Sequence, residues 1–448
     1  MLVSFGHSQT PSGELDARRV TESSPIDLAS VEYIVSNASI AEAWKKVRSN
    51  KGAPGVDKIS IERFPKWGRP KWKDTKKQLL AGTYNPSPVL RVEIPKESGG
   101  MRRLGIPCVL DRVLMQAIAK VLGNLFNPTF SDFSYGYMPG RSVQQAARQA
   151  QGFYRQGYIY QVDIDLEKFF DTVNHDVLME RVGRKVKNKD LMKLLGRFLR
   201  AGVVVNGRLQ PTRVGVPQGS PVSPILSNIL LDDLDQELET RGHKFIRYAD
   251  DLAIFVKSKR AGERVLASVS RYLEQKLKVK VNQAKSKVSH VKDSSVLGFK
   301  IHGKKLKTLD RKVQGFKREL KRITRRCPGI SILSRILRLK QYVQGWMAHY
   351  GCGLKYDDAV KLDGWIRRRL RMCYWKQWRR PRRRIRELIK LGVNKRDAIR
   401  LGLSRKSYWR LSKTLATNSG LSNAHFDKIG LISIRTLWCK IHHPATAR

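Results

Sequence analysis

Two adjacent carboxylates, Asp250 and Asp251, lie between two runs of β-branched and aromatic residues at 245–248 and 252–256. Such runs on either side of a short break predict a β-hairpin whose tight turn carries both acids. Because neighbouring carboxylates repel each other, a positive group is expected beside them. Taken alone, the pattern also fits a solvated hairpin tip.

A second acidic element is the predicted strand at 160–166, in which Asp163 and Asp165 alternate with apolar residues. Period-2 alternation puts the apolar side chains on one face and the carboxylates on the other. Asp165 would then meet the two hairpin acids, Asp250 and Asp251. Three carboxylates from two strands suit a phosphoryl-transfer centre with two Mg²⁺ ions. One ion activates an attacking 3′-hydroxyl, and the other holds a triphosphate and stabilises the leaving oxygen. The residues therefore predict polymerase chemistry.

The motif at 248–251, Tyr-Ala-Asp-Asp, and the upstream run at 165–171, Asp-Leu-Glu-Lys-Phe-Phe-Asp, resemble the palm of reverse transcriptases. More narrowly, the chain is similar to the reverse transcriptase/maturase proteins encoded by group II introns. The similarity is to the compact, bacterial class C type without an HNH endonuclease domain. It runs from about residue 31 to the C-terminus, and the motifs follow the family's order.

This resemblance implies a right-hand polymerase fold, with α/β fingers and palm around an antiparallel sheet, followed by an α-helical thumb/maturase domain. It also implies an RNA-directed DNA polymerase, a nucleotidyltransferase. Asp165, Asp250 and Asp251 would be its catalytic residues and the ligands of two Mg²⁺ ions per active site.

A predicted hairpin at 89–107 has a Gly-Gly turn flanked by Lys96 and Arg102. In the family this hairpin is the fingertip, and the resemblance implies that both cations hold the incoming dNTP, a tetra-anion. Basic residues near a turn are otherwise ordinary solvated side chains, so that alternative stays open.

Three further nucleotide contacts are implied by matching motif positions. Phe170 stands where the family has an aromatic side chain that excludes a ribose 2′-hydroxyl, with a core phenylalanine as the alternative. Gln218 belongs to a Gly- and Pro-rich loop at 215–224 whose backbone can approach a nascent base pair. Lys285 matches a lysine near the leaving pyrophosphate, where it would act as a general acid, although it is one lysine among many.

The formal net charge of +50 arises from 88 Lys and Arg against 38 Asp and Glu in 448 residues. Such a charge repels itself in a compact protein unless a polyanion neutralises it, and phosphate contacts dominate affinity for nucleic acids. The sequence contains no apolar run of about 18 residues and no signal peptide pattern, so no membrane partner is expected. Five scattered cysteines without CxxC spacing predict neither a disulfide framework nor a zinc site. We expect a bacterial cytoplasmic protein that associates with the nucleoid when bound to DNA.

We expect four segments: a disordered arm at 1–30, fingers and palm at 31–305, an α-helical thumb/maturase domain at 306–400 and a basic DNA/RNA-contacting tail at 401–448. In the third segment, a helix at 362–378 that stops at Pro381 interleaves apolar and aromatic residues with arginines. A basic face is usually only solvated, but this density beside an apolar stripe suits a helix that lies along an RNA backbone. The arginines expected to bind RNA are Arg367, Arg368, Arg371, Arg379, Arg380, Arg382 and Arg383.

The resemblance also implies the partners: the parent group II intron RNA, an RNA template with a DNA primer, dNTPs and target DNA. The protein would promote intron splicing and mobility by target-primed reverse transcription. A retron-type or defence reverse transcriptase is one rival, and the long basic thumb argues against it. A purely RNA-binding splicing cofactor with an inactive palm is another, and the intact acids and Gln218 argue against it. The oligomeric state stays open between a monomer and a homodimer.

Overall fold

The computed structural model describes residues 29–95, 100–303, 305–326 and 329–444. The chain divides into two compact units. We call Met1–Ser142 with Gly157–His290 unit 1, and Val143–Gln156 with Val291–Arg448 unit 2. One helix from the predicted fingers and palm segment, α6 (Val143–Arg155), thus belongs with unit 2.

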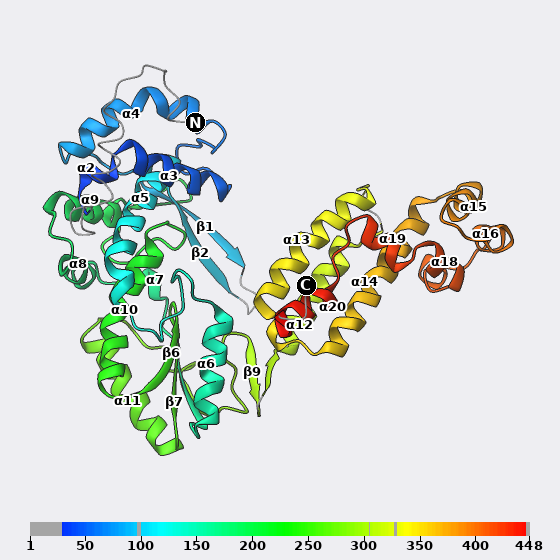
Figure 1. Cartoon of the computed structure of the whole chain (residues 1–448). Coiled ribbons are helices and arrows are strands. Elements are labelled where there is room, and N and C mark those ends of the chain that lie inside the picture. The colour runs from blue at the N-terminus through cyan, green and yellow to red at the C-terminus, as the bar shows by residue number, and fades with distance from the viewer. Residues whose placement is uncertain (1–28, 96–99, 304, 327–328, 445–448) are drawn as a thin grey trace. The chain divides into compact units, whose positions relative to one another are not determined.

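Unit 1 contains a four-stranded antiparallel sheet, which lies in the lower part of that unit in the view of Figure 1. Its strands, in spatial order, are β6 (Lys244–Tyr248), β7 (Asp251–Val256), β3 (Tyr160–Ile164) and β8 (Lys287–His290). Val162 and Ile164 of β3 are fully buried, as the alternation in the sequence predicts. The helix α11 (Lys259–Gln275) packs on this apolar face, because a Cβ added at Gly262 would meet side chains of Val288 and Val162.

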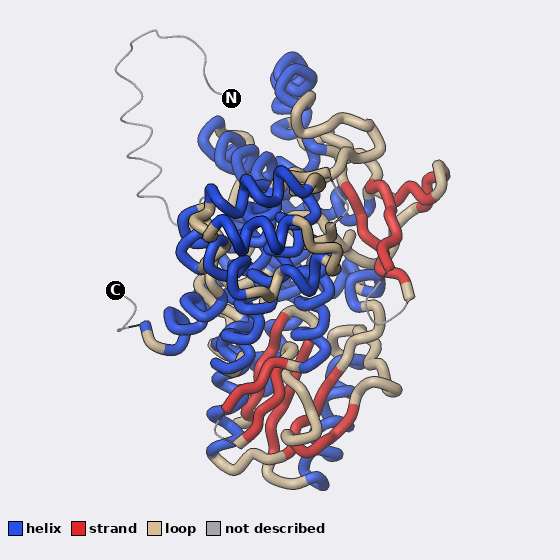
Figure 2. The backbone as a smooth tube through the Cα atoms, turned by 90° about the vertical axis from the view of Figure 1, so that its right-hand side faces the viewer, coloured by secondary structure: helices blue, strands red, loops and turns tan. Residues whose placement is uncertain are grey.

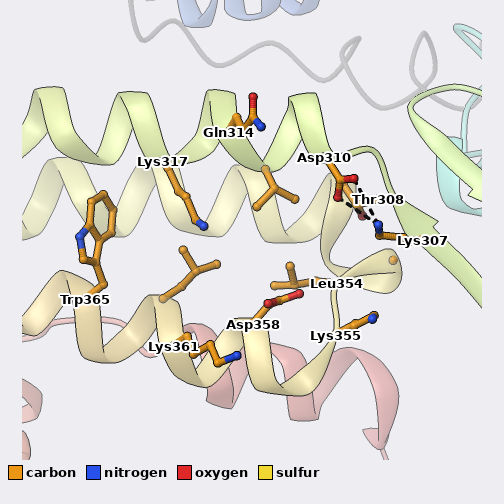
Figure 3. A pocket seen from close by; sticks show the side chains of 13 residues that line it. Lys307, Thr308, Asp310, Gln314, Lys317, Leu354, Lys355, Asp358, Lys361 and Trp365 are labelled. Atoms are coloured by element: carbon orange, nitrogen blue, oxygen red, sulfur yellow. Dashed lines mark hydrogen bonds and ion pairs between the residues drawn. The ribbon is translucent and has the colours of Figure 1, made fainter.

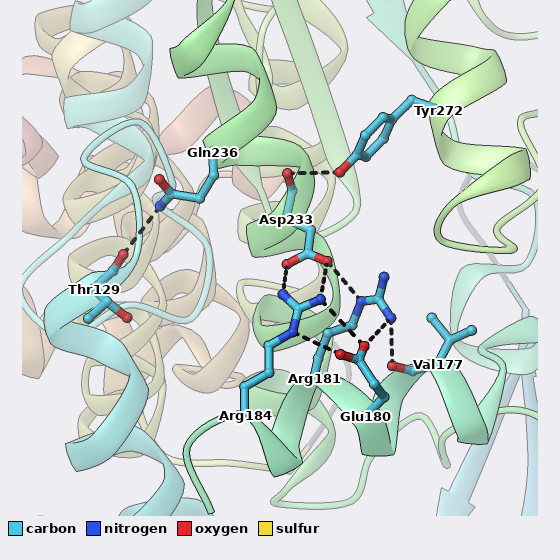
Figure 4. A network of polar contacts seen from close by, with 8 residues as sticks. All are labelled: Thr129, Val177, Glu180, Arg181, Arg184, Asp233, Gln236 and Tyr272. Carbon is cyan, nitrogen blue, oxygen red and sulfur yellow. Dashed lines mark hydrogen bonds and ion pairs between the residues drawn. The ribbon is translucent and has the colours of Figure 1, made fainter.

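Further helices of unit 1 share one hydrophobic core with the sheet. They are α5 (Val109–Phe126), α7 (Phe169–Thr172), α8 (His175–Gly183), α9 (Lys189–Arg200) and α10 (Ser223–Thr240). An ion-pair network joins three of the helices (Figure 4). Arg181 of α8 and Arg184, which caps the end of that helix, bind Asp233 of α10, with nitrogen–oxygen distances of 3.0 and 2.6 Å. The hydroxyl of Tyr272 on α11 donates to the carbonyl of Asp233 at 3.3 Å.

A second four-stranded sheet belongs to unit 1, and Figure 2 shows the two sheets as separate groups of strands. Its strands, in spatial order, are β2 (Met101–Ile106), β1 (Val89–Pro95), β4 (Val203–Val205) and β5 (Arg208–Gln210). The predicted hairpin at 89–107 is confirmed, since β1 and β2 pair antiparallel. Three N-terminal helices pack on α5: α2 (Val31–Ile34), α3 (Asn37–Ser49) and α4 (Phe64–Leu80). The 3-10 turn η1 (Asn127–Thr129) follows α5.

Unit 2 contains a two-stranded hairpin, β9 (Phe299–His302) and β10 (Lys305–Thr308), and its other regular elements in the described residues are helices. Its long helices are α12 (Asp310–Ile323), α13 (Ile332–Tyr350) and α14 (Tyr356–Gln377), with the 3-10 turn η2 (Gly351–Gly353) between the last two. Six short helices follow: α15 (Pro381–Lys390), α16 (Lys395–Gly402), α17 (Tyr408–Leu411), α18 (Leu415–Gly420), α19 (Asn423–Lys428) and α20 (Ile434–His442). The predicted order of an α/β part with an antiparallel sheet and then a helical part is confirmed.

The helix predicted at 362–378 begins earlier, at Tyr356, and ends at Gln377. Pro381 does not merely stop it, because this proline is the first residue of α15. Proline is favoured at that position since its missing N–H would have no partner within the helix. None of the described helices is long and apolar enough to span a bilayer.

Candidate active site

The turn between β6 and β7 presents the two adjacent acids. Tyr248 pairs with Asp251 across the hairpin, which leaves Ala249 and Asp250 as its two turn residues. Ala249 adopts a positive φ of +59°, the left-handed conformation that tight hairpin turns require. The predicted hairpin with an acidic turn is therefore present.

Asp165 reaches the same end of the sheet from the neighbouring strand. Ile164 of β3 pairs with Leu252 of the antiparallel strand β7. Asp165, which follows Ile164, therefore lies beside Asp251, which precedes Leu252. The backbone N–H of Asp165 donates to the Ser286 hydroxyl at 3.1 Å, and its carbonyl accepts from the Asn282 N–H at 2.8 Å. These bonds fix the backbone from which the third carboxylate extends.

The acids repel one another. Burial raises the pKa of the Asp250 carboxyl, and the charge of Asp165 raises it further, while Arg102 opposes both effects. Asp251 keeps part of its surface exposed, yet burial and the charges of Asp250, Asp165 and Asp163 raise its pKa to about 6. A cation placed among these groups would relieve the repulsion and hold them all ionised.

The donor set fits Mg²⁺, which prefers carboxylate oxygens. In the described part of the chain, no three or more His, Cys, Asp or Glu side chains are arranged so that they could hold a metal ion as they stand. Mg²⁺ usually keeps several waters and is bound through one or two carboxylates together with substrate phosphates, so an all-protein cage is not required. The mutual repulsion of Asp165, Asp250 and Asp251 is the feature that fits a dication here.

Two of the predicted cations lie close to the acids. Lys285 Nζ is 3.7 Å from Asp165 Oδ2, and its side chain is largely exposed. Arg102 lies on β2 opposite Ile94, is exposed, and is close enough to Asp250 to affect that carboxyl. Lys96 lies outside the described residues.

Phe170 and Gln218 belong to two segments that are bonded to each other. The carbonyl of Phe170 accepts from the Val216 N–H at 2.6 Å, just before Gln218 in the loop. The carbonyl of Gln218 accepts from the Gly105 N–H of β2 at 2.8 Å. Phe170 is nine-tenths buried and packs edge-on against Phe169, with ring centroids 5.2 Å apart. This burial suits a core residue as well as a gate beneath a sugar, so its role as a gate stays a prediction.

Tyr137 is a neighbour of the acids that sequence reasoning did not select. Burial raises the pKa of its hydroxyl, the charge of Asp250 raises it further, and Arg102 opposes this. The residue has a positive φ of +61°. The signal in the sequence was its place in an aromatic and Gly-rich turn at 133–140.

A buried network that sequence reasoning also missed supports the acidic turn. Arg247 is 1% exposed, and its guanidinium donates to both carboxylate oxygens of Asp235, to Asn228 Oδ1 and to the carbonyl of Ala249. The amide of Asn228 donates to the carbonyl of Gly136 at 2.9 Å. A Cβ at Gly136 would collide with the backbone of Ala249. The acidic turn is therefore in close contact with the loop at 133–140, which Asn228 in turn joins to α10.

The predicted RNA-binding arginines fall into two groups. Arg379, Arg380, Arg382 and Arg383 are exposed, and the last two lie on the first turn of α15. The other three, Arg367, Arg368 and Arg371 on α14, contact other residues of unit 2. Arg371 is buried and donates to the carbonyl of Leu421 at 2.8 and 2.9 Å. Arg368 lies over the Trp409 ring, and Arg367 is 3.9 Å from Asp363. The burial of Arg371 argues against contact with RNA, because its guanidinium already holds the C-terminal helices.

Two family models match the chain in sequence order. Residues 94–301 match "Reverse transcriptase (RNA-dependent DNA polymerase)", and residues 313–391 match "Group II intron, maturase-specific domain". The chain belongs to the reverse transcriptase/maturase family of group II introns. The first model spans the acidic hairpin, β2 of the fingertip and the loop at 215–224, and the second spans α13 and α14.

This reverse transcriptase/maturase is similar to three curated proteins, and the share of each protein that it covers differs. Protein YkfC of Escherichia coli is 32% identical, over 58% of this chain and 80% of that protein. Group II intron-encoded protein LtrA of Lactococcus lactis is 27% identical, over 62% of this chain and 57% of LtrA. A putative COX1/OXI3 intron 2 protein of Saccharomyces cerevisiae is 30% identical, over 58% of this chain and 37% of that protein. The chain therefore matches only a part of the two intron-encoded relatives.

Proposed function

We propose that the protein is an RNA-directed DNA polymerase that also binds its parent group II intron RNA, promotes its splicing, and moves it by target-primed reverse transcription. The observation that carries the polymerase half is the convergence of Asp165, Asp250 and Asp251 at one end of a buried antiparallel sheet. The proposed partners are the intron RNA, an RNA template with a DNA primer, dNTPs and target DNA. We place the protein with the bacterial class C type of this family.

The three carboxylates would hold two Mg²⁺ ions, which supply Lewis-acid activation of a 3′-hydroxyl and neutralise charge on the leaving pyrophosphate. Arg102, together with Lys96, would bind the triphosphate and orient it towards the acids. Lys285 Nζ would donate a proton to the leaving pyrophosphate oxygen. Phe170 would exclude a ribose 2′-hydroxyl. The backbone around Gln218 would lie against the nascent base pair.

Asp250→Asn tests the polymerase half, because it removes one charge with little change of shape. Primer extension on poly(rA)/oligo(dT) should fall at least about 10²-fold, the scale of a lost electrostatic stabiliser. Asp176→Asn, in the first turn of α8, is a matched control with the same change of charge and should extend normally. If Asp250→Asn extends primers within a few-fold of the wild type, Asp250 is not a catalytic residue.

The splicing half is supported by the exposed arginines at 379–383 and by the net charge of +50. Replacing Arg379, Arg380, Arg382 and Arg383 with Gln should weaken binding of structured intron RNA and slow splicing at moderate salt. Each arginine that binds a phosphate should, when replaced, flatten the slope of log affinity against log salt by roughly 0.7–0.9. Extension of a short, saturating primer–template should survive. Proportional loss of both activities in a variant that stays folded by circular dichroism would contradict two separable functions.

A further inference from the structure

A cavity of about 1020 Å³ lies within unit 2, at the upper end of the roughly 300–1,000 Å³ typical of ligand pockets. Residues of α6, the β9–β10 hairpin, η2 and α20 line it, and we call it the hairpin pocket. Six cations contribute to its walls: Arg148, Lys292, Lys300, Lys305, Lys307 and Lys355. The described residues that line it include no Asp or Glu.

A neighbouring cavity of unit 2 shows that this one-sided charge is not general. The second cavity, of about 630 Å³, lies between α12 and α14 and is lined by both signs of charge (Figure 3). There Lys307 pairs with Asp310 at 3.1 Å, and Asp358 lies on the facing helix. In the hairpin pocket, by contrast, Arg148, Lys300, Lys305 and Lys355 are exposed cations without acidic groups among them. Such a cluster raises the local concentration of anions.

Aromatic rings line the same pocket. Trp438 stacks on His442 with ring centroids 4.1 Å apart, and its Nε1–H donates to the carbonyl of Leu354 at 2.7 Å. Tyr356 packs edge-on against Trp438 at 5.1 Å and is 39% exposed. A ring fixed in this way beside cations can stack with a base while the phosphates on either side meet the lysines.

The walls are held together by tight contacts. The Thr308 hydroxyl donates to the carbonyl of Tyr350 at 2.8 Å, which joins the hairpin to the end of α13. A Cβ at Gly353 would lie 2.6 Å from the backbone nitrogen of Thr308, so η2 and β10 are in close contact. A pocket formed in advance of binding loses little entropy when a ligand enters.

We propose that the hairpin pocket binds a short stretch of single-stranded nucleic acid, with its phosphates on the cations and one base against Tyr356. The exposed Tyr356 ring among the cations favours a nucleic acid over an acidic peptide, because every base presents a π-face and a carboxylate does not. A base within a duplex has no free face for stacking, so a single strand is the better ligand. The proposal requires binding alone and stands whether or not the chain synthesises DNA.

Cross-linking tests the location of this site. An 8-nucleotide strand carrying 5-iodouracil, as RNA and as DNA, is irradiated with the full-length protein in EDTA and excess unlabelled primer–template duplex. Cross-linked peptides should contain Tyr356 or Trp438 with both strands, and Asp250→Asn should cross-link equally well. Cross-links confined to peptides that do not line the pocket would overturn the proposal.

Affinity tests the chemistry, measured by fluorescence anisotropy with the same strands and duplex competitor. Tyr356→Ala should weaken binding about 5- to 100-fold, the effect of losing one stacked base, and Tyr356→Phe should bind as the wild type does. Replacing Arg148, Lys300, Lys305 and Lys355 with Gln should flatten the salt slope by up to about 3.

The matched control is Lys395→Gln/Lys428→Gln, which removes exposed charge from α16 and α19 of the same unit. An equal loss per charge in this control would show general attraction and overturn a defined site. Competition by polyglutamate as strong as by the oligonucleotide, with no effect of Tyr356→Ala, would assign the pocket to an acidic protein partner instead. If the pocket variants extend primers normally, the loss of the pocket proposal would leave the polymerase proposal unaffected.

Discussion

Arg247 allows a direct test of how the acidic turn is held in place. Its guanidinium lies 2.5–2.9 Å from the carboxylate oxygens of Asp235 and 3.1 Å from the carbonyl of Ala249. Arg247→Leu leaves Asp235, which is fully buried, without its partner. Removing one partner of a buried pair costs about 3–5 kcal/mol of stability. The same change removes the hydrogen bond to Ala249, and a bond of that charged kind is worth about 1.5–3 kcal/mol.

The double variant Arg247→Leu/Asp235→Leu separates these two effects. Exchanging both members of a buried ion pair for apolar residues is often neutral for stability, so the melting temperature should recover towards that of the wild type. The carbonyl of Ala249 still lacks its donor, so the turn that carries Asp250 stays loosened. The extension rate should therefore remain about 10- to 100-fold below that of the wild type, which corresponds to the energy of the missing hydrogen bond.

Two measurements are needed: thermal unfolding by circular dichroism, and single-turnover, single-nucleotide extension at saturating dNTP. Arg184→Leu is the control, because Arg184 is half exposed and pairs with Asp233 of α10, which is itself partly exposed. It should change both quantities little. If the extension rate of the double variant recovers in parallel with its melting temperature, Arg247 acts on stability alone and the positioning argument is refuted.

Three further predictions concern the sugar, the triphosphate and the core. Phe170→Val should raise incorporation of rNTP relative to dNTP in single-nucleotide extension, and unchanged discrimination would make Phe170 a core residue only. Arg102→Gln should raise KM for dNTP about 10-fold or more, whereas Arg103→Gln, whose arginine lies 3.5 Å from Glu93, should not; equal effects would indicate a general loss of charge. Burial raises the pKa of Asp111 to about 7, above its value of 3.8 when unfolded, so its protonated form is favoured in the fold. Its contribution to stability is complete below about pH 4 and is lost as the pH rises through 7, by up to about 4 kcal/mol. Asp111→Asn should remove this dependence in urea unfolding at pH 5 and pH 8, and an unchanged dependence would place its origin elsewhere.

The sequence by itself determined the acidic hairpin, the alternating strand before it and the fingertip hairpin. Each depends on residues within a few positions of one another: alternation at period 2 fixes which side chains share a face, and a short polar break between apolar runs fixes a turn. The apolar recurrence at 362–378 likewise predicted most of α14, because residues three and four apart share one face of a helix. The order of the motifs gave the family, which the two family models confirm.

Only the tertiary structure decided which polar residues are buried and which segments meet. Arg371 stands among other arginines in the sequence, yet its guanidinium donates to the carbonyl of Leu421, fifty positions away. Arg247 precedes the acids directly, but its role depends on Asp235 and Asn228 on another element. The hairpin pocket combines α6 with residues from 292 to 442, and no local pattern relates them. Burial and charge pairing depend on distances in space, and local periodicity in a chain carries no information about contacts between segments so far apart in sequence.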